Sequence, residues 1–380
     1  MDEEVEKFRE NLQRGGGTWS REEKIELEYE SDKLSDSTLK NVGSTWKDLE
    51  PYKIDDSLKD YVDGDYKIIG FDESSNTRSW TYSKLASFKF GECQLSFKDG
   101  KYHKELIMYK PILTYIEDNK HKLIIYKTVI KKFIKTIKNQ FYIGSLKNPI
   151  DDLVDWFEKT YVKKIDGYID AYNYYQPSLG HVIDRIRTAD EALKSLIRIK
   201  EESKLGKVKN LIFLGDGIQM FRQHIFPPSA FTNFFYEFIK KYNINYFAFS
   251  KQSRLRDAQG NFLLPTMSQR VFKKEKFLVE LPDLSKYTKS KTYYVRIVEG
   301  TPALRFDVPD FSTINDAMTI LRNLIPYSPH GYPLCLEEAH NASTLLPSEK
   351  NKLEAKFYEL QIDEKTKIYA QNYRQKIIPP

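Results

Sequence analysis

The sequence predicts an α/β fold: a mixed sheet flanked by helices, with a helical insertion and a helical N-terminal arm. Apolar strand-like runs alternate with amphipathic helical stretches, as in KIIGFD at 67–72 and LIFLGD at 211–216. A helix-like segment at 231–243 and another strand-like run at 244–251 follow the second of these. Strand, helix and strand in this order are typical of a parallel crossover, so at least part of the sheet is expected to be parallel.

The other expected elements follow from the same patterns. The first 60 residues alternate charged and apolar positions at helical spacing and contain no dense apolar run, which predicts a helical arm. Asp99 and Gly100 separate two strand-like segments and give a hairpin signal. The first strand is expected at 66–72, and further strands are expected at 87–97, 104–109, 291–297 and 303–309. Helices are expected at 314–325 and after the loop near 331–334.

These elements predict three parts along the 380 residues. Residues 1–60 form the arm, 61–345 the α/β domain, and 346–380 a C-terminal tail. Between roughly 110 and 205 the pattern becomes helical, and the stretch at about 110–180 is expected to be a basic helical insertion in the domain. Length alone allows one large domain with insertions or two domains.

The distribution of charge favours an anionic partner. The chain has a formal net charge of +6 and a pI of about 8.8. Seven lysines occur without an intervening acidic residue, and four of them, Lys127, Lys131, Lys135 and Lys138, lie on one helical stripe opposite an apolar one. This pattern indicates a solvated lysine face over a packed apolar face, a DNA-contacting face, or both together.

Several classes of protein are disfavoured. Cys93 and Cys335 are the two cysteines, too few for a disulfide framework or a four-ligand zinc site, which fits a reducing compartment. The N-terminus lacks the apolar segment of a signal peptide, and no run approaches the ~20 apolar residues of a membrane span. We expect a soluble, cytoplasmic protein.

Two expected strands end in an aspartate, Asp72 and Asp216. Carboxylates at the ends of neighbouring strands can converge at one edge of a sheet. Phosphodiester hydrolysis requires charge neutralisation and an activated water, which Mg²⁺ or Mn²⁺ held by carboxylates can supply. The two aspartates are therefore candidate metal ligands, although Asp216 before Gly217 also fits a simple turn.

Three more residues are candidates for the same chemistry. Glu191 lies on an expected helix shortly before the strand that ends in Asp216 and could supply a third carboxylate, in competition with its neighbours Asp190, Glu201 and Glu202. Tyr332 and His340 lie eight residues apart across a loop and the start of a helix. Histidine can act as a metal ligand, a general acid or a phosphate contact near neutral pH, although a lone helical histidine is more often structural.

The strand-end Asp72, the DG at 216–217 and the late GYP…EAH segment with Tyr332 and His340 together resemble the NurA nuclease family of archaea and some bacteria. The paired strands in YYVRIVEGTPALRFDVPD resemble the same family, and the likeness spans roughly 60–345 without the stretch near 110–180.

The resemblance implies a ribonuclease-H-like fold and a Mn²⁺-dependent single-strand endonuclease and 5′-to-3′ exonuclease, with Mg²⁺ as the other candidate ion. It also implies a homodimer that acts on single-stranded DNA and duplex ends with a HerA-type hexameric helicase in DNA end resection and recombinational repair. Carried over to this sequence, it makes Asp72, Glu191 and Asp216 metal ligands, with Tyr332 and His340 completing the catalytic site. Lys251 would lie where a basic residue could contact the scissile phosphate.

Three departures from the family pattern indicate a divergent member. Glu73 follows Asp72 where small residues are usual, the helical stretch before Glu191 is long, and the interval from Glu191 to Asp216 is stretched. A catalytically weakened module that binds DNA ends and docks a translocase is therefore the alternative. A ribonuclease-H-like integrase or RNA-guided nuclease is a third class, which the GYP…EAH segment disfavours.

Overall fold

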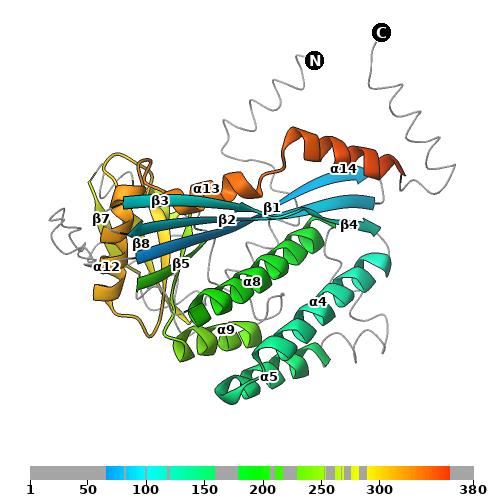
Figure 1. The fold of residues 1–380 in the computed structure, drawn as a ribbon, viewed down its shortest axis with the longest axis horizontal. Helices are drawn as coiled ribbons and strands as arrows, with labels where there is room; N and C mark the ends of the chain where they lie inside the picture. The colour runs from blue at the N-terminus through cyan, green and yellow to red at the C-terminus, as the bar shows by residue number, and fades with distance from the viewer. Residues whose placement is uncertain are drawn as a thin grey trace, which may run out of the picture.

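The fold is seen in a computed structural model (Figure 1). It describes residues 66–80, 83–98, 101–117, 120–158, 179–205, 210–216, 229–251, 253, 262–266, 268, 275–281 and 289–359. The helical arm expected at 1–60 lies outside these ranges.

The centre of the fold is one nine-stranded sheet in the order β3-β2-β1-β5-β6-β9-β8-β7, with β4 pairing the first part of β2. The strands are β1 (Tyr66–Trp80), β2 (Ser83–Lys98), β3 (Lys101–Met108), β4 (Ile112–Glu117), β5 (Asn210–Asp216), β6 (Asn245–Ser250), β7 (Phe277–Glu280), β8 (Ser290–Arg296) and β9 (Leu304–Pro309). β1, β5 and β6 run parallel to one another, and the remaining pairs are antiparallel. The expected mixed sheet is confirmed.

The first five strands in space, β3-β2-β1-β5-β6, have the order and directions of a ribonuclease-H-like sheet: an antiparallel meander followed by two parallel strands. The predicted crossover is the unit from β5 through α9 (Ser229–Lys241) to β6. Phe235 of this helix contacts Tyr246 of β6, whereas Phe231, Phe234 and Phe238 contact α4. The buried aromatic and isoleucine side chains of α9 are Phe231, Phe234, Phe235, Tyr236, Phe238 and Ile239.

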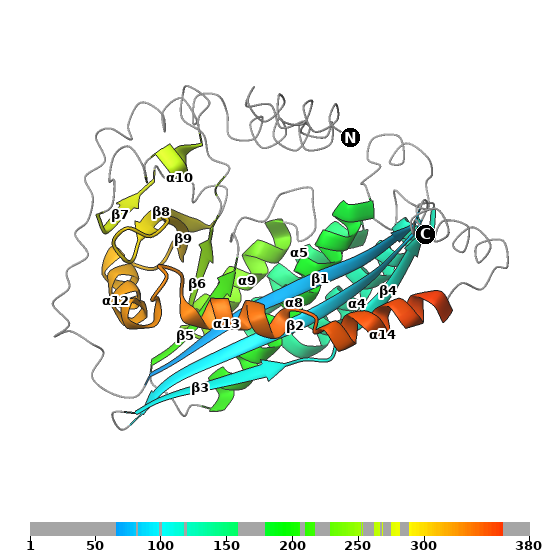
Figure 2. The same ribbon diagram turned by 90° about the horizontal axis from the view of Figure 1, so that it is seen from above.

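Helices cover both faces of the sheet (Figures 1 and 2). One face carries α8 (Leu179–Leu205) and α9, with α4 (Lys120–Phe141) and α5 (Lys147–Phe157) beyond them. The other carries α12 (Ile314–Leu324), α13 (Leu334–Ser343) and α14 (Pro347–Glu359). The short helices are η3 (Gly144–Leu146), α10 (Leu263–Thr266) and η6 (Ile325–Tyr327).

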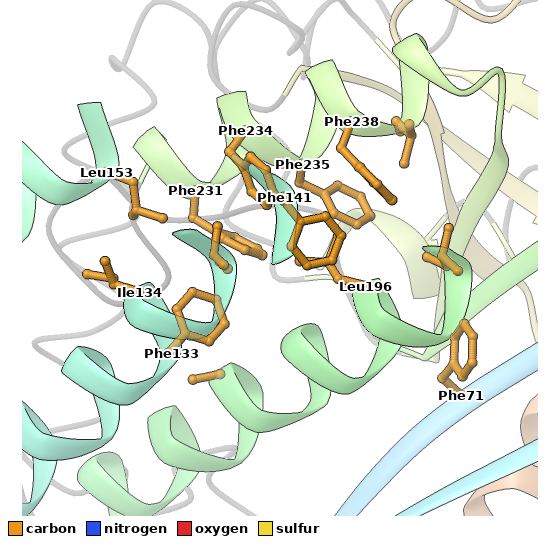
Figure 3. Close-up of a cluster of buried hydrophobic side chains, with 14 of the residues drawn as sticks. Phe71, Phe133, Ile134, Phe141, Leu153, Leu196, Phe231, Phe234, Phe235 and Phe238 are labelled. Atoms are coloured by element: carbon orange, nitrogen blue, oxygen red, sulfur yellow. The ribbon is translucent and has the colours of Figure 1, made fainter. Parts of the chain in front are cut away.

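Each face has its own apolar core. Figure 3 shows the first, in which Phe133 and Phe141 of α4 meet Phe231 and Phe234 of α9. Alternate residues of β1 divide between the two cores: Ile69 belongs to this one and Ile68 to the core under α12 and α13. Because side chains of a strand alternate between faces, the polar residues that continue β1 are divided in the same way.

Some elements differ from expectation. Residues 112–117, expected to begin the helical stretch, form strand β4 and extend the sheet along β2. The helical pattern begins only at Lys120, where α4 starts. Within the range expected to be a tail, α14 is a helix. A search of the described helices finds none long and apolar enough to cross a membrane.

Candidate metal centre

Asp72 and Asp216 lie side by side at the point where a parallel pair of strands separates. β1 and β5 pair up to Phe71 and Gly215, and each aspartate is the next residue of its strand. β5 ends at Asp216, whereas β1 continues to Trp80. The two aspartates therefore converge as expected, but only Asp216 ends a strand. Asp72 lies inside β1, because β1 stays paired with β2 beyond the point where β5 ends.

α13 brings His340 to this point because it lies directly on the backbone of β1 and β2. A Cβ on Gly70 would lie 2.6 Å from the carbonyl oxygen of Cys335, and one on Gly91 would lie 2.3 Å from that of Ala339. Glycine is thus required at both positions for the helix to approach this closely. The approach places His340 beside Asp72 of β1.

Asp72 is held by two groups from α13. Its Oδ2 lies 2.8 Å from Nδ1 of His340 and accepts a hydrogen bond of 2.9 Å from the hydroxyl of Ser343. The hydroxyls of Ser343 and Ser74 lie 2.6 Å apart, so the serine is itself fixed. Asp72 is buried, whereas the His340 side chain is 54% exposed. The site therefore has a rigid base and an open side.

The ligand atoms of Asp72, Asp216 and His340 all lie within 4.8 Å of one another. Two carboxylate oxygens and an imidazole nitrogen are a donor set that suits Mn²⁺, and the carboxylates also suit Mg²⁺. Burial raises the pKa of Asp216, and the Asp72 carboxylate raises it further, while the Tyr332 hydroxyl, Lys251 and His340 act in the opposite direction. A buried carboxylate beside a second carboxylate favours a shared cation, so the residues present fit a divalent metal.

Tyr332 and Lys251 border the same carboxylates. The ammonium of Lys251, which is exposed, lies 4.2 Å from the centre of the Tyr332 ring. The hydroxyl of Tyr332 is buried and makes no hydrogen bond of normal geometry within the described part of the chain. Burial and the charge of Asp216 raise the pKa of Tyr332, so the hydroxyl beside this aspartate stays neutral.

Glu191 approaches from α8, on the opposite face of the sheet from α13. It is outside the cluster within 4.8 Å, and its carboxylate is bound by Arg187 with an Nη1–Oε2 distance of 3.0 Å. Burial raises the pKa of Glu191 to about 8, with contributions from Asp72 and Asp216, while Arg187 lowers it. Glu191 thus lies close enough to the two aspartates to sense their charges.

The three acidic competitors of Glu191 are placed elsewhere. Asp190 forms an ion pair with Lys194, and Glu201 and Glu202 form ion pairs with Arg198. Glu73, the residue after Asp72, points toward α8 and accepts a hydrogen bond of 2.8 Å from Lys194. None of these carboxylates belongs to the cluster of Asp72, Asp216 and His340.

The lysines at 131, 135 and 138 lie apart from this centre. All three are exposed on α4, whose apolar side chains Phe133 and Ile137 are buried. This confirms the expected amphipathic helix; the side chain of Lys127 lies outside the described residues. Figure 1 shows α4 separated from α13 by α8 and the sheet, so the lysine face and His340 belong to different sides of the molecule.

Ser343 and Arg187 are site residues that sequence reasoning missed. Ser343 lies three residues after His340, one helical turn away, so it was placed to share a partner with that histidine. Arg187 precedes Glu191 by four residues, which is the spacing of a helical ion pair. Both spacings were visible in the sequence, but neither specifies a contact with another element.

The chain is similar to several solved nucleases. It shares 16% identity with the crystal structure of the NurA nuclease from Sulfolobus solfataricus over 84% of this chain and 92% of that one, with a TM-score of 0.39. A crystal structure of NurA bound to dAMP and manganese shares 12% identity over 90% of this chain and 95% of that one, with a TM-score of 0.31. Endonuclease V from Bacillus subtilis shares 9% identity over 88% and 95% of the two chains, also with a TM-score of 0.31. No curated protein matches.

Residues 224–344 match the NurA domain family. The matched range contains Lys251, Tyr332 and His340 and therefore includes the GYP…EAH segment on which the sequence resemblance depended. The match confirms that resemblance over residues 224–344.

Proposed function

We propose that this chain is a divalent-metal-dependent nuclease that hydrolyses phosphodiester bonds in DNA, with Mn²⁺ or Mg²⁺ as its ion. The observation that carries the proposal is the cluster of Asp72, Asp216 and His340, whose ligand atoms lie within 4.8 Å of one another. The match of residues 224–344 to the NurA domain family supports the same conclusion from sequence. These three residues would hold the ion, with Glu191 as the candidate fourth ligand.

A divalent ion bound there would neutralise phosphate charge and activate a water molecule. The protein groups around it have separate tasks. Asp72 is fixed by His340 and Ser343, so its carboxylate is pre-oriented. The His340 contact uses Nδ1, which leaves Nε2 of the half-exposed ring for the ion, a phosphate oxygen or a proton. Lys251, held over the Tyr332 ring, is suited to bind a phosphate oxygen of the substrate.

The finer features of the activity also belong to this proposal. We include single-strand endonuclease and 5′-to-3′ exonuclease activity, a homodimer, and a HerA-type helicase as partner in DNA end processing and repair. These features are what the resemblance to the NurA family implies, and the match of residues 224–344 supports that resemblance. The exposed lysines at 131, 135 and 138, together with Lys127, would bind DNA away from the cut site, since α4 lies on the other side of the sheet from α13.

The first test is cleavage of labelled single- and double-stranded DNA, with and without Mn²⁺, by Asp72→Asn and Asp216→Asn variants. Each substitution removes a carboxylate charge without changing side-chain shape, and we expect cleavage to fall by at least about 10²-fold while the circular dichroism spectrum is unchanged. Asp310→Asn, on an exposed residue beyond β9, is the matched control and should retain full activity. Undiminished cleavage by both active-site variants would refute the proposal.

The same assay tests the alternative of a DNA-end-binding module. Salt-sensitive DNA binding by the wild-type protein with no cleavage under any divalent ion would favour that module. The extra carboxylate of Glu73 is one feature of the sequence that favours this DNA-end-binding module. Because Glu73 faces α8 and pairs with Lys194, it does not add a charge to the cluster of proposed ligands.

A further inference from the structure

Arg187 joins α8 to β1 beside the proposed metal ligands. Its Nη1 donates to two acceptors: Oε2 of Glu191 at 3.0 Å and the carbonyl oxygen of Glu73 at 2.9 Å. Glu73 is the residue after Asp72, so a single nitrogen connects the carboxylate of Glu191 to the strand position next to the first aspartate. The arginine side chain is 29% exposed, and that of Glu191 is 16% exposed.

The neighbouring cations of α8 bind other carboxylates. Lys194 contacts Glu73 and Asp190 through its ammonium, and Arg198 contacts Glu92 of β2. Neither makes an ion pair with Asp72, Glu191 or Asp216 within the parts of the chain that are described. Arg187 is therefore distinguished from the other two by its bond to a proposed ligand.

Arg187 restrains Glu191 through two bonds, one within α8 and one to the sheet. Arg187 and Glu191 are one helical turn apart, so their ion pair alone would only restrain the side chain on its own helix. The second bond, to the backbone of β1, ties that pair to the sheet. A planar guanidinium that stays charged is suited to bridge a carboxylate and a carbonyl in this way.

We propose that Arg187 is a positioning residue, which holds the Glu191 carboxylate against β1 at Glu73 so that Glu191 and Asp72 act together on the divalent ion. This inference rests on the proposed function, because it assigns a role to Arg187 only if the cluster binds a metal. Arg187 acts through Glu191 and not through the substrate. Groups that orient ligands in this way typically contribute about 10–100-fold to metal affinity.

The test is a double-mutant cycle on Mn²⁺ affinity, measured by calorimetry on the full chain without DNA. We expect Arg187→Gln to weaken Mn²⁺ binding about tenfold. In a Glu191→Gln background the same change should have no further effect, because the group through which it acts is gone. Arg198→Gln, which removes the ion pair from α8 to Glu92 of β2, should bind Mn²⁺ as the wild-type protein does.

Three results would overturn the role of Arg187. Wild-type affinity in a folded Arg187→Gln protein is one, and an equal loss in both backgrounds is another. The third is a loss of Mn²⁺ affinity in Arg198→Gln that matches the loss in Arg187→Gln, since this would show a general effect of loosening α8. If Arg187→Gln fails to fold, Arg187→Lys, which keeps the positive charge, replaces it in the same cycle with Glu191→Gln and is judged by the same results.

Failure of this inference can be distinguished from failure of the proposed function by Asp72→Asn in the same titration. If Asp72→Asn weakens Mn²⁺ binding and Arg187→Gln does not, the metal site is correct and the role of Arg187 is wrong. If Asp72→Asn also binds Mn²⁺ normally, the metal site itself is wrong.

Discussion

Asp72 and Glu73 are adjacent carboxylates of one strand with different surroundings. Asp72 faces α13, where His340 and Ser343 hold it, and Glu73 faces α8, where Lys194 binds it. The alternation of side chains along a strand separates them, so adjacency in sequence does not make them partners. Glu73, where the NurA pattern has a small residue, therefore changes the contact between β1 and α8 and leaves the cluster of Asp72, Asp216 and His340 unchanged.

The two glycines under α13 allow a sharp prediction. In Gly91→Ala the new Cβ would lie 2.3 Å from the carbonyl oxygen of Ala339 and 2.5 Å from the amide nitrogen of Ser343. Because both atoms belong to the backbone, α13 must move away from β2 and carry His340 with it. We expect a decrease of about 1–3 kcal/mol in unfolding free energy, measured by urea titration, and a loss of DNA cleavage.

A second variant separates backbone from side-chain crowding at this position. Adding Ala339→Gly to Gly91→Ala removes only a methyl group and should not restore stability or cleavage, because the crowded atom is the carbonyl oxygen. Full rescue by Ala339→Gly would show that α13 is not held by its backbone contact with β2.

At the residue scale, sequence reasoning identified the residues that converge but not those that fix them. Asp72 and Asp216 each follow an apolar run, and His340 lies in a recognisable family segment, so each carries a local signal. Ser343 and Arg187 act through contacts with residues more than 100 positions away in the chain. Such contacts follow from how α8 and α13 lie on the sheet, which a single sequence does not specify.

Among the elements, α14 is tied to the sheet by an ion pair between buried Lys89 of β2 and partly exposed Glu349. The Lys89 side chain is 2% exposed, and its Nζ lies 2.9 Å from Oε2 of Glu349 and 3.3 Å from the carbonyl oxygen of Thr344. Burial opposes ionisation of Glu349, but hydrogen bonds from Lys89 and the Leu346 amide outweigh it and lower its pKa. The charged glutamate is therefore part of what holds α14 in place.

This pair predicts an asymmetry between two substitutions. Glu349→Ala leaves the Lys89 ammonium buried without its carboxylate and should cost about 1–3 kcal/mol of unfolding free energy at pH 7. Lys89→Met replaces the buried charge with an apolar side chain of similar length and should cost less. Equal or reversed costs in urea titrations would contradict this account of α14.

The pH dependence of the same pair has a definite sign. Because the folded-state pKa of Glu349 is below its ordinary value of 4.5, its contribution is complete above that pH and is lost as the pH falls through the lower folded-state value. The stability difference between wild type and Glu349→Ala should therefore shrink on acidification below about pH 4.5.

The exposed lysines of α4 have a proposed role in DNA binding that can be tested. Charge reversal of the exposed lysines 131, 135 and 138 to glutamate should weaken DNA binding and reduce its salt dependence, by about 0.9 in the log–log slope for each phosphate that is no longer neutralised. Lys240 and Lys241 of α9 are also exposed, and their reversal is the control. An equal effect of both sets would indicate general charge attraction and no specific DNA contact at α4.

Elements were predictable where the pattern was strong. The buried strand LIFLGD and the aromatic helix after it gave β5 and α9 because burial imposes a continuous apolar run on one and a stripe on the other. β4 was read as helical because its six residues ILTYIE are too short to show a period, and their strand conformation comes from pairing with β2.

At the scale of the whole molecule, the site results from the topology of the sheet. β1 is paired with antiparallel β2 on one side and parallel β5 on the other, and Asp72 and Asp216 meet where the pairing of β1 with β5 stops. The chain then passes through β6 to β9 and α12 before α13 returns to cover β1 and β2 (Figure 2). The order Asp72, Asp216, His340 in sequence thus becomes a single cluster.

The fold class was predictable because two parts of the sheet have sequence signatures. These are the hairpin between β2 and β3 and the crossover from β5 to β6. The position of the antiparallel strands β7, β8 and β9 next to β6 was not, since no local pattern specifies which edge they join. The helical layers on the two faces follow from the two apolar cores, into which alternate residues of β1 project.

The central claim is that Asp72, Asp216 and His340 form one metal centre. Crystals of the wild-type protein soaked in Mn²⁺, with data collected at the manganese absorption edge, test it most directly. We predict an anomalous peak between the Asp72 and Asp216 carboxylates with His340 in contact, and loss of that peak in Asp216→Asn crystals. A wild-type map with no peak there, or an equal peak in Asp216→Asn, would contradict the account.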